Sequence, residues 1–210
     1  MNTTPAFTQM RKLIILAALA SFSPAMHGQD AIRLDEAQKA ARKLAGSASG
    51  ISDAPFEVAV DLEKPQGIKA EGVGLIVLPD RKLNVELLAA ANSAITPLGQ
   101  LWTLKLAVAT NGKATPADKL RHLTIRDGEN DREVSLYFLG ATKSAADGLE
   151  LVVYTKGREP VLRVPINKRV SEKQEFPIEV SGAKNDDNSG TLSLRLFGEY
   201  DARLLLMKEE

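Results

Sequence analysis

The chain has 210 residues, of which 44% are hydrophobic and 26% charged, proportions that indicate one soluble globular domain with a sizeable core. Its 27 basic and 27 acidic residues balance, so the charge gives no reason to expect a nucleic acid or an anionic membrane as partner. The lack of cysteine excludes disulfides, zinc–thiolate sites and cysteine nucleophiles.

Residues 1–25 have the three parts of a secretory signal peptide. Arg11 and Lys12 precede an apolar run over 13–20, and small residues follow it. Cleavage after Ala25 leaves the apolar run a fuller length than cleavage after Ala20. The run is far shorter than the roughly 20 residues that span a bilayer. We therefore expect a secreted or periplasmic protein with no membrane span after cleavage.

Residues 26–50 predict one helix and a flexible linker. The apolar positions of the helix, over 31–44, recur at helical spacing: Leu34, Ala37, Ala41 and Leu44. This stripe is narrow and half alanine, so we expect the helix to dock weakly or to stand off the domain. The sequence G-S-A-S-G at 46–50 is typical of a short linker.

Residues 51–210 predict a single β domain, which begins with two strands and a short helix. The run 56–62 alternates between apolar and polar residues, which is the pattern of a half-buried strand. The run 72–78 is apolar throughout and predicts a strand buried on both faces. Its glycines, Gly72 and Gly74, favour a bulge or a tight crossing of strands, and close approach to a ligand is the alternative.

The inserted helix is predicted over 84–94, with Asn84 as its N-cap. The next strand, over 101–110, alternates strictly, and the alternation places Trp102 on the same face as the leucines that follow. We interpret Trp102 as a core residue, because large aromatic side chains dominate core burial. A sugar-stacking role is the alternative. Asn111-Gly112 is the strongest turn signal in the chain.

His122 lies in the next predicted strand, over 120–126, and is the only histidine after the predicted cleavage site. A lone histidine can act as a general base. No acidic residue lies beside it in the sequence, so the pattern favours a surface histidine.

Two β-hairpins are predicted near the C-terminus, over 148–167 and 190–208, with a strand over 176–180 between them. The last strand contains Leu204–Met207, which is apolar on both faces. Such a strand is either central and buried or an exposed edge that adds a partner's strand.

The loop over 184–190, K-N-D-D-N-S-G, is the most acidic turn of the chain. It does not complete a calcium loop, because Leu196 stands where a glutamate is needed, so a solvated hairpin loop is predicted. The loop belongs to the second hairpin, whose turn is predicted to contain Tyr200. The candidate interaction surface is therefore Asp186, Asp187, Asn188, Tyr200 and Asp201.

About nine strands at hairpin-like spacing predict an all-β fold, a β-sandwich of immunoglobulin-like or jelly-roll type, with an N-terminal helix and one short inserted helix. No nucleophile, cofactor or metal pattern is recognisable, which favours an exported non-enzymatic module that binds an envelope or extracellular protein or a glycan. The alternative is a secreted glycan hydrolase, which requires two carboxylates roughly 5 to 9.5 Å apart in a groove.

Overall fold

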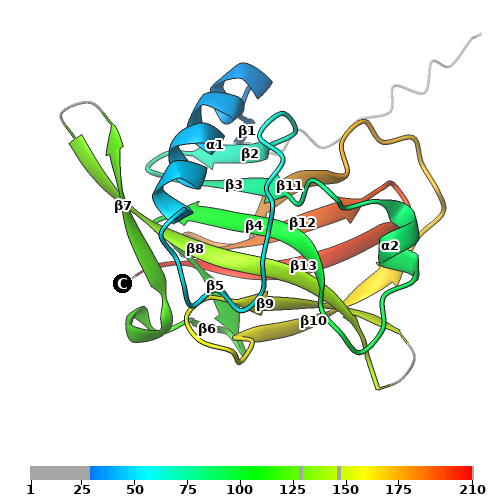
Figure 1. Cartoon of the computed structure of the whole chain (residues 1–210). Helices are drawn as coiled ribbons and strands as arrows, with labels where there is room; N and C mark the ends of the chain where they lie inside the picture. Colours follow the sequence, from blue (N-terminus) through cyan, green and yellow to red (C-terminus); the bar gives the residue numbers. More distant parts are fainter. Residues whose placement is uncertain (1–28, 128–129, 146–147, 210) are drawn as a thin grey trace, which may run out of the picture.

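The computed structural model describes residues 29–127, 130–145 and 148–209, so the predicted signal peptide lies outside the described residues. Strands hold 50% of the described residues and helices 13%, which confirms the all-β class. The predicted β-sandwich of about nine strands is not confirmed. The described residues form 13 strands, and antiparallel pairing links all of them into one sheet that curls into a half-barrel (Figure 1).

The elements follow one another in this order: β1 (Asp30–Ala31), α1 (Leu34–Ala48), β2 (Gln66–Ala70), β3 (Val73–Pro79), α2 (Val85–Ala89), β4 (Thr96–Leu104), β5 (Leu106–Thr110), β6 (Lys113–Ala114), the 3₁₀-helix η1 (Ala117–Lys119), β7 (Arg121–Asp127), β8 (Asn130–Lys143), β9 (Leu149–Tyr154), β10 (Leu162–Lys168), β11 (Ile178–Lys184), β12 (Ser189–Leu196) and β13 (Tyr200–Lys208). In the sheet the order is β1-β2-β3-β4-β8-β9-β10-β13-β12-β11, with β7 beside β8 and with β5 between β13 and β6.

The curl of the sheet brings its two ends together. In Figure 1, strands β11, β12 and β13 lie behind β3, β4 and β8. A side-chain carbon built on Gly182 of β11 would lie 2.6 Å from Ile68 Cδ1 of β2, so the two strands run against each other with no room for a larger residue. A single curled sheet therefore presents two facing layers, and apolar and polar residues alternate along its strands as they do in a sandwich.

The concave face of the sheet encloses the larger hydrophobic core, to which most strands contribute. Its largest fully buried residues include Tyr137, Leu98, Leu101, Leu139, Leu151 and Ile178. The Tyr137 hydroxyl accepts a hydrogen bond from the Val108 N–H at 3.1 Å. Burial raises the pKa of the Tyr137 phenol above its ordinary value, so this group stays neutral and structural.

A second core covers the convex face of β3, β4, β8 and β9, where α1 and the segment 51–62 lie over the strands (Figure 1). The prediction of a strand over 56–62 is wrong, since the segment makes only one bridge in the described structure, between Val60 and Asp80. Its alternation is real, because Phe56 packs edge-on against Phe138 and Tyr154 at centroid distances of 6.1 and 5.6 Å. An extended segment that covers a sheet alternates just as a strand does.

The N-terminal helix is confirmed, with different ends. It begins at Leu34 and continues through Gly46 to Ala48, so most of the predicted linker is helical. The helix docks on the sheet and does not stand off it, as its buried residues show: Ala37, Ala41 and Leu44. The inserted helix α2 is confirmed with its N-cap, where Asn84 Oδ1 accepts the Leu87 N–H at 2.8 Å, although it is shorter than predicted.

The run 101–110 forms two strands and not one. Lys105 has a left-handed backbone (φ 57°), which ends β4 at Leu104 and turns the chain toward β13, where it continues as β5. Trp102 is buried, as predicted for a core residue, but it belongs to the convex-face core, whereas Val108 belongs to the concave one. Strict alternation over 101–110 would place Trp102 and Val108 on one face, but the chain changes direction at Lys105 and puts them in different cores.

The hairpins β9–β10 and β12–β13 are confirmed. The turn at Asn111-Gly112 is also confirmed, with φ of 53° and 73°, the left-handed pair of a type I′ turn. Strand β13 lies between β12 on one side and β10 and β5 on the other. Leu206 and Met207 are therefore paired on both sides and are central, whereas Leu204 and Leu205 pair with β12 alone among the described strands.

Candidate functional site

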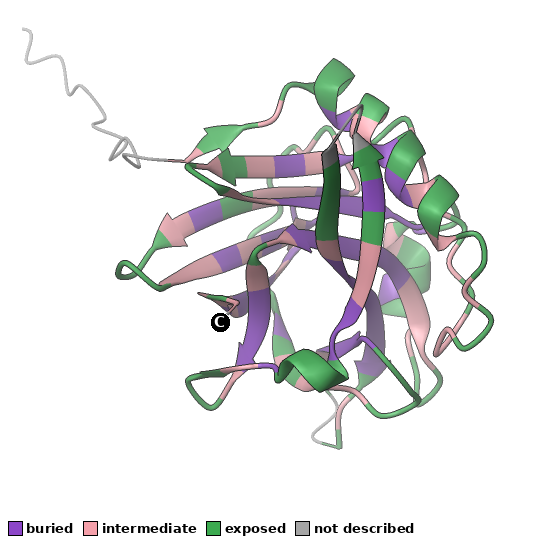
Figure 2. Cartoon of the chain, turned by 90° about the vertical axis from the view of Figure 1, so that its left-hand side faces the viewer, coloured by how far each residue is buried: buried purple, intermediate pink, exposed green. Residues whose placement is uncertain are grey.

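A groove of about 500 Å³ lies between α1 and the sheet, and we name it the α1 groove. Four parts of the chain line it: one face of α1, the turn end of the β2–β3 hairpin, the end of β4, and the β7–β8 hairpin. Figure 2 shows α1 and these strands from the side of the molecule where they meet.

The strand pairing explains why this part of the convex face stays open. Pairing between β4 and β8 begins at Thr103 and Ser135, whereas residues 131–134 of β8 pair with β7. The β7–β8 hairpin therefore extends beyond the body of the sheet. Because the chain also turns away at Lys105, the end of β4 lies between this hairpin and α1, where Trp102, Thr103 and Leu104 line the groove.

The floor of the α1 groove is apolar. It includes Leu44, Ile76, Trp102, Ile125 and Val134. The Trp102 Nε1–H is donated to Gln100 Oε1 at 3.1 Å, so the indole makes no polar demand on a ligand. A floor of this kind favours the hydrocarbon part of a ligand.

The rim of the α1 groove is cationic. It contains Lys39, Lys43, Lys69 and Arg132, and Glu36 is the single carboxylate among the described lining residues. Glu36 is paired with Lys69, whose Nζ lies 2.9 Å from Oε1 and 3.1 Å from Oε2. Lys39 and Lys43 are one turn apart on α1, so their stems lie on one face of the helix. The groove therefore combines an apolar floor with a positive rim.

The structure does not bring the predicted interaction surface together. Asp186, Asp187 and Asn188 lie in the β11–β12 turn, where the Asn188 carbonyl accepts the N–H of Lys208 at the end of β13. Tyr200 is at the other end of β13, separated from that turn by the length of β12, roughly 23 Å at the usual rise per residue. Tyr200 is not in the turn as predicted. The left-handed residues of the turn are Phe197 and Gly198, and Tyr200 is the first residue of β13 and is buried in the concave core.

The carboxylates of the β11–β12 turn are engaged within the turn. Asp186 accepts the Ser189 hydroxyl at 2.7 Å and the N–H groups of Asn188 and Ser189, and these bonds lower the pKa of Asp186. Asp187 pairs with Lys184 at 2.6 Å, which lowers the pKa of Asp187 and raises that of Lys184. The turn borders a second cavity of about 390 Å³, between the β2–β3 and β11–β12 hairpins. Nowhere in the described ranges do three acidic or histidine residues come together in a way that could hold a metal ion.

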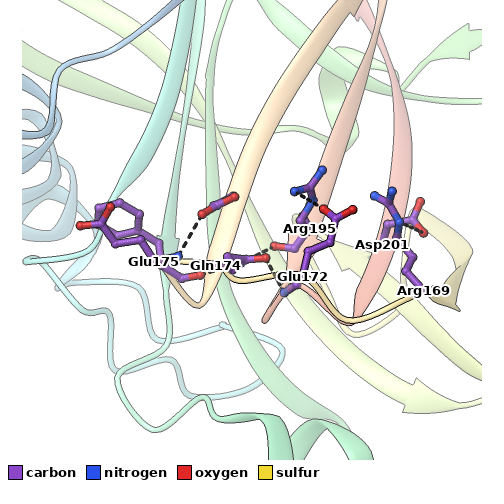
Figure 3. A network of polar contacts seen from close by, with 9 residues as sticks. Arg169, Glu172, Gln174, Glu175, Arg195 and Asp201 are labelled. Carbon is purple, nitrogen blue, oxygen red and sulfur yellow. Dashed lines mark hydrogen bonds and ion pairs between the residues drawn. The ribbon is translucent and has the colours of Figure 1, made fainter. Parts of the chain in front are cut away.

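At the turn of the β12–β13 hairpin, polar contacts join the hairpin to the segment that follows β10 (Figure 3). Asp201 lies 3.9 Å from Arg169, and the segment that follows β10 wraps around the hairpin turn. Gln174 fastens this segment: its Nε2 donates to the Arg195 carbonyl at 3.0 Å, and its Oε1 accepts the Gly198 N–H. Asp201 therefore belongs to a network that holds the fold.

His122 has partners that the sequence did not identify. Its Nδ1 lies 3.2 Å from Ser135 Oγ and 3.4 Å from Glu133 Oε1, and Ser135 donates to Glu209 Oε1 at 2.6 Å. A catalytic triad places the serine and the carboxylate on opposite ring nitrogens. Here both lie at Nδ1, and Ser135 is buried, so the arrangement does not present a nucleophile.

A third, smaller cavity, of about 260 Å³, has both carboxylates and cations in its lining: Asp61, Asp80, Glu175, Lys64 and Arg81. Both oxygens of Asp80 accept backbone N–H groups, from Ala59 and Lys82, at 2.8 Å. Asp80 therefore fastens the segment 51–62 to the sheet and does not act as a free acid or base.

Comparison with protein-family models finds no match, and searches among curated proteins and among solved structures find no similar protein. Within the described residues, the longest helix, α1, has 15 residues, and none is long and apolar enough to cross a membrane.

Proposed function

We propose that the protein is an exported, non-enzymatic binding module that holds an apolar ligand in the α1 groove. The observation that carries the proposal is the groove itself, a concavity of about 500 Å³ with an apolar floor, between α1 and the sheet. This volume lies within the range of small-molecule sites, roughly 300 to 1,000 Å³. Export rests on the predicted signal peptide.

The wall formed by α1 suits a site that must admit a ligand. The buried side of the helix is short, with two alanines and one leucine. The ion pairs that join α1 to the rest of the chain, Lys69–Glu36 and Arg42–Glu63, are solvent-exposed. Exposed ion pairs stabilise a structure by only about 0.2 to 1 kcal/mol each. Such a helix can shift against the sheet at low cost while the strands stay in place.

No observation on the α1 groove favours the alternative, a carboxylate-based hydrolase that acts on glycans. That chemistry needs two carboxylates that face each other across a substrate. The described lining offers Glu36, and this residue is paired with Lys69. The binding of an envelope protein or a glycan at another surface stays a prediction.

The protein carries its own reporter for the test. Trp102 is the only tryptophan of the chain and lies on the floor of the groove. Nonionic alkyl ligands of increasing chain length, titrated below their micelle concentrations into the chain from residue 26 onward, should change the emission of Trp102 in a saturable way. Each added methylene that enters the groove should tighten Kd about fourfold, from about 0.8 kcal/mol per buried CH₂. No saturable change with any chain length would refute the proposal.

A further inference from the structure

We propose that the ligand of the α1 groove is a single-chain amphiphile with an anionic head group, such as a fatty-acid carboxylate. This inference rests on the proposed function and names the class of its ligand. The hydrocarbon chain lies on the Trp102 side of the groove, and the head group lies at the rim among Lys39, Lys43 and Arg132.

The first argument is the separation of polarity within one groove. The floor offers hydrocarbon and an indole whose N–H is already bonded to Gln100. The charged groups belong to long side chains that keep their charges at the solvent edge while their stems line apolar surface. An amphiphile has the same arrangement, with a chain that gains from burial and a head that stays near water.

The second argument is the sign of the charge and its origin. The four cations come from three separate elements, with Lys39 and Lys43 on α1, Lys69 on β2 and Arg132 on β8, and all of them line the same opening. The chain as a whole is neutral, so a cationic rim is a local feature and not a consequence of composition. An anion at this opening is attracted by the net positive charge of the lining, in which four cations stand against the single carboxylate of Glu36.

The third argument is size. The volume of about 500 Å³ lies in the lower half of the usual range for small-molecule sites, which fits one hydrocarbon chain better than two. The groove is also a recess between α1 and the β7–β8 hairpin and not a flat face. We therefore place a monomeric amphiphile there, and contact with a bilayer surface is a competing outcome of the test.

The test compares three twelve-carbon ligands, with a carboxylate, a neutral sugar or a trimethylammonium head, each kept below its micelle concentration. The carboxylate should bind about tenfold more tightly than the neutral ligand and more tightly still than the cation, because each of three exposed ion pairs adds a gain of about 1.4- to fivefold. Raising the salt concentration to 1 M should remove this preference and leave the neutral ligand's Kd unchanged.

The variant K39Q/K43Q/R132Q should lose the preference for the carboxylate and keep its affinity for the neutral ligand. The matched control is Arg42→Gln, which removes a cation from the same helix at a position outside the groove lining. It should keep the preference. Thermal melting of both variants confirms that the fold is retained.

Each outcome decides one question. Equal affinity of the native chain for the three head groups overturns the anionic head group and leaves the proposed function intact. Failure of all three ligands to bind overturns both. Binding to vesicles of anionic phospholipid, with no binding of the monomeric ligands, overturns the inference in favour of a membrane surface.

Discussion

Gly74→Val should abolish most ligand binding without weakening the fold. Gly74 lies in β3 between Lys69 of β2 and Leu104 of β4, and it lines the α1 groove. A side-chain carbon built on it would lie 3.6 Å from the Ile68 carbonyl oxygen and 3.9 Å from Lys69 Cβ, which are ordinary contacts. Valine therefore fits the backbone, and its three carbons enter the space that the ligand would occupy.

The expected magnitudes follow from this geometry. Three carbons that displace about three methylenes of ligand, at about 0.8 kcal/mol each, cost about 2.4 kcal/mol, or a roughly 50-fold weaker Kd. Glycine in a strand interior costs about 0.5 to 1 kcal/mol, so valine should raise the melting temperature by roughly 1 to 4 °C.

Two measurements check this prediction: Kd from the Trp102 titration and the melting temperature from circular dichroism. Ser181→Val is the control, since it adds the same side chain at an exposed position of β11 outside the groove lining. A Gly74→Val variant that is fully stable and binds as tightly as the native chain refutes the placement of the ligand. A Gly74→Val variant that melts several degrees lower than the native chain refutes the conclusion that a valine side chain fits at this position.

Two further predictions concern the fold. Arg121 is nearly buried and pairs with Asp53 at 2.8 and 3.0 Å, which lowers the pKa of Asp53 below its ordinary value of 3.8. The pair should therefore stabilise the fold above pH 3.8 and lose its effect as the pH falls through the lowered pKa of Asp53. The melting temperatures of the native chain and of Asp53→Asn should differ at pH 6 and converge in strong acid. A difference in melting temperature that stays constant with pH contradicts this. Gln174→Ala leaves the part-buried Gly198 N–H without its partner and should lower the free energy of unfolding by about 1 to 3 kcal/mol in urea titrations, whereas an unchanged midpoint would show that water replaces the amide.

The strands were predictable because alternation is a local property of the chain. The C-terminal hairpins, the turn at Asn111-Gly112 and the N-cap at Asn84 all follow from residues within a few positions of each other. The same locality explains the error over 56–62. Alternation reports that one side of an extended segment is buried, and it does not report whether the other edge meets a strand.

The curl of the sheet was not predictable from periodicity. A sandwich and a half-barrel bury the same alternating faces, and they differ in where strands bend and which strands meet. Here a decisive bend is at Lys105, a residue type with no preference for a left-handed backbone, so its neighbours impose the conformation. The predicted surface failed for a related reason, because Tyr200 and Asp186 are close to one hairpin in sequence and lie at its opposite ends in space.

The α1 groove left one trace in the sequence. The sequence favours a bulge or a tight crossing of strands at Gly74, and close approach to a ligand is the alternative. The ladder with β2 and β4 runs through Gly74 in regular register, and the side chain that is missing there leaves groove volume. The cations could not be grouped from sequence, because Lys39 and Arg132 line one groove only through the packing of α1 beside the β7–β8 hairpin.

The alanine stripe of α1 connects the fold with the groove. Ala37 and Ala41 are buried, and side chains this short bring the helix backbone close to the sheet. On the next face, Ala40 lines the groove and leaves volume that a leucine would fill. The composition that predicted weak docking therefore has two consequences: the helix contacts the sheet through a small area, and the space beside that contact stays open to an apolar ligand.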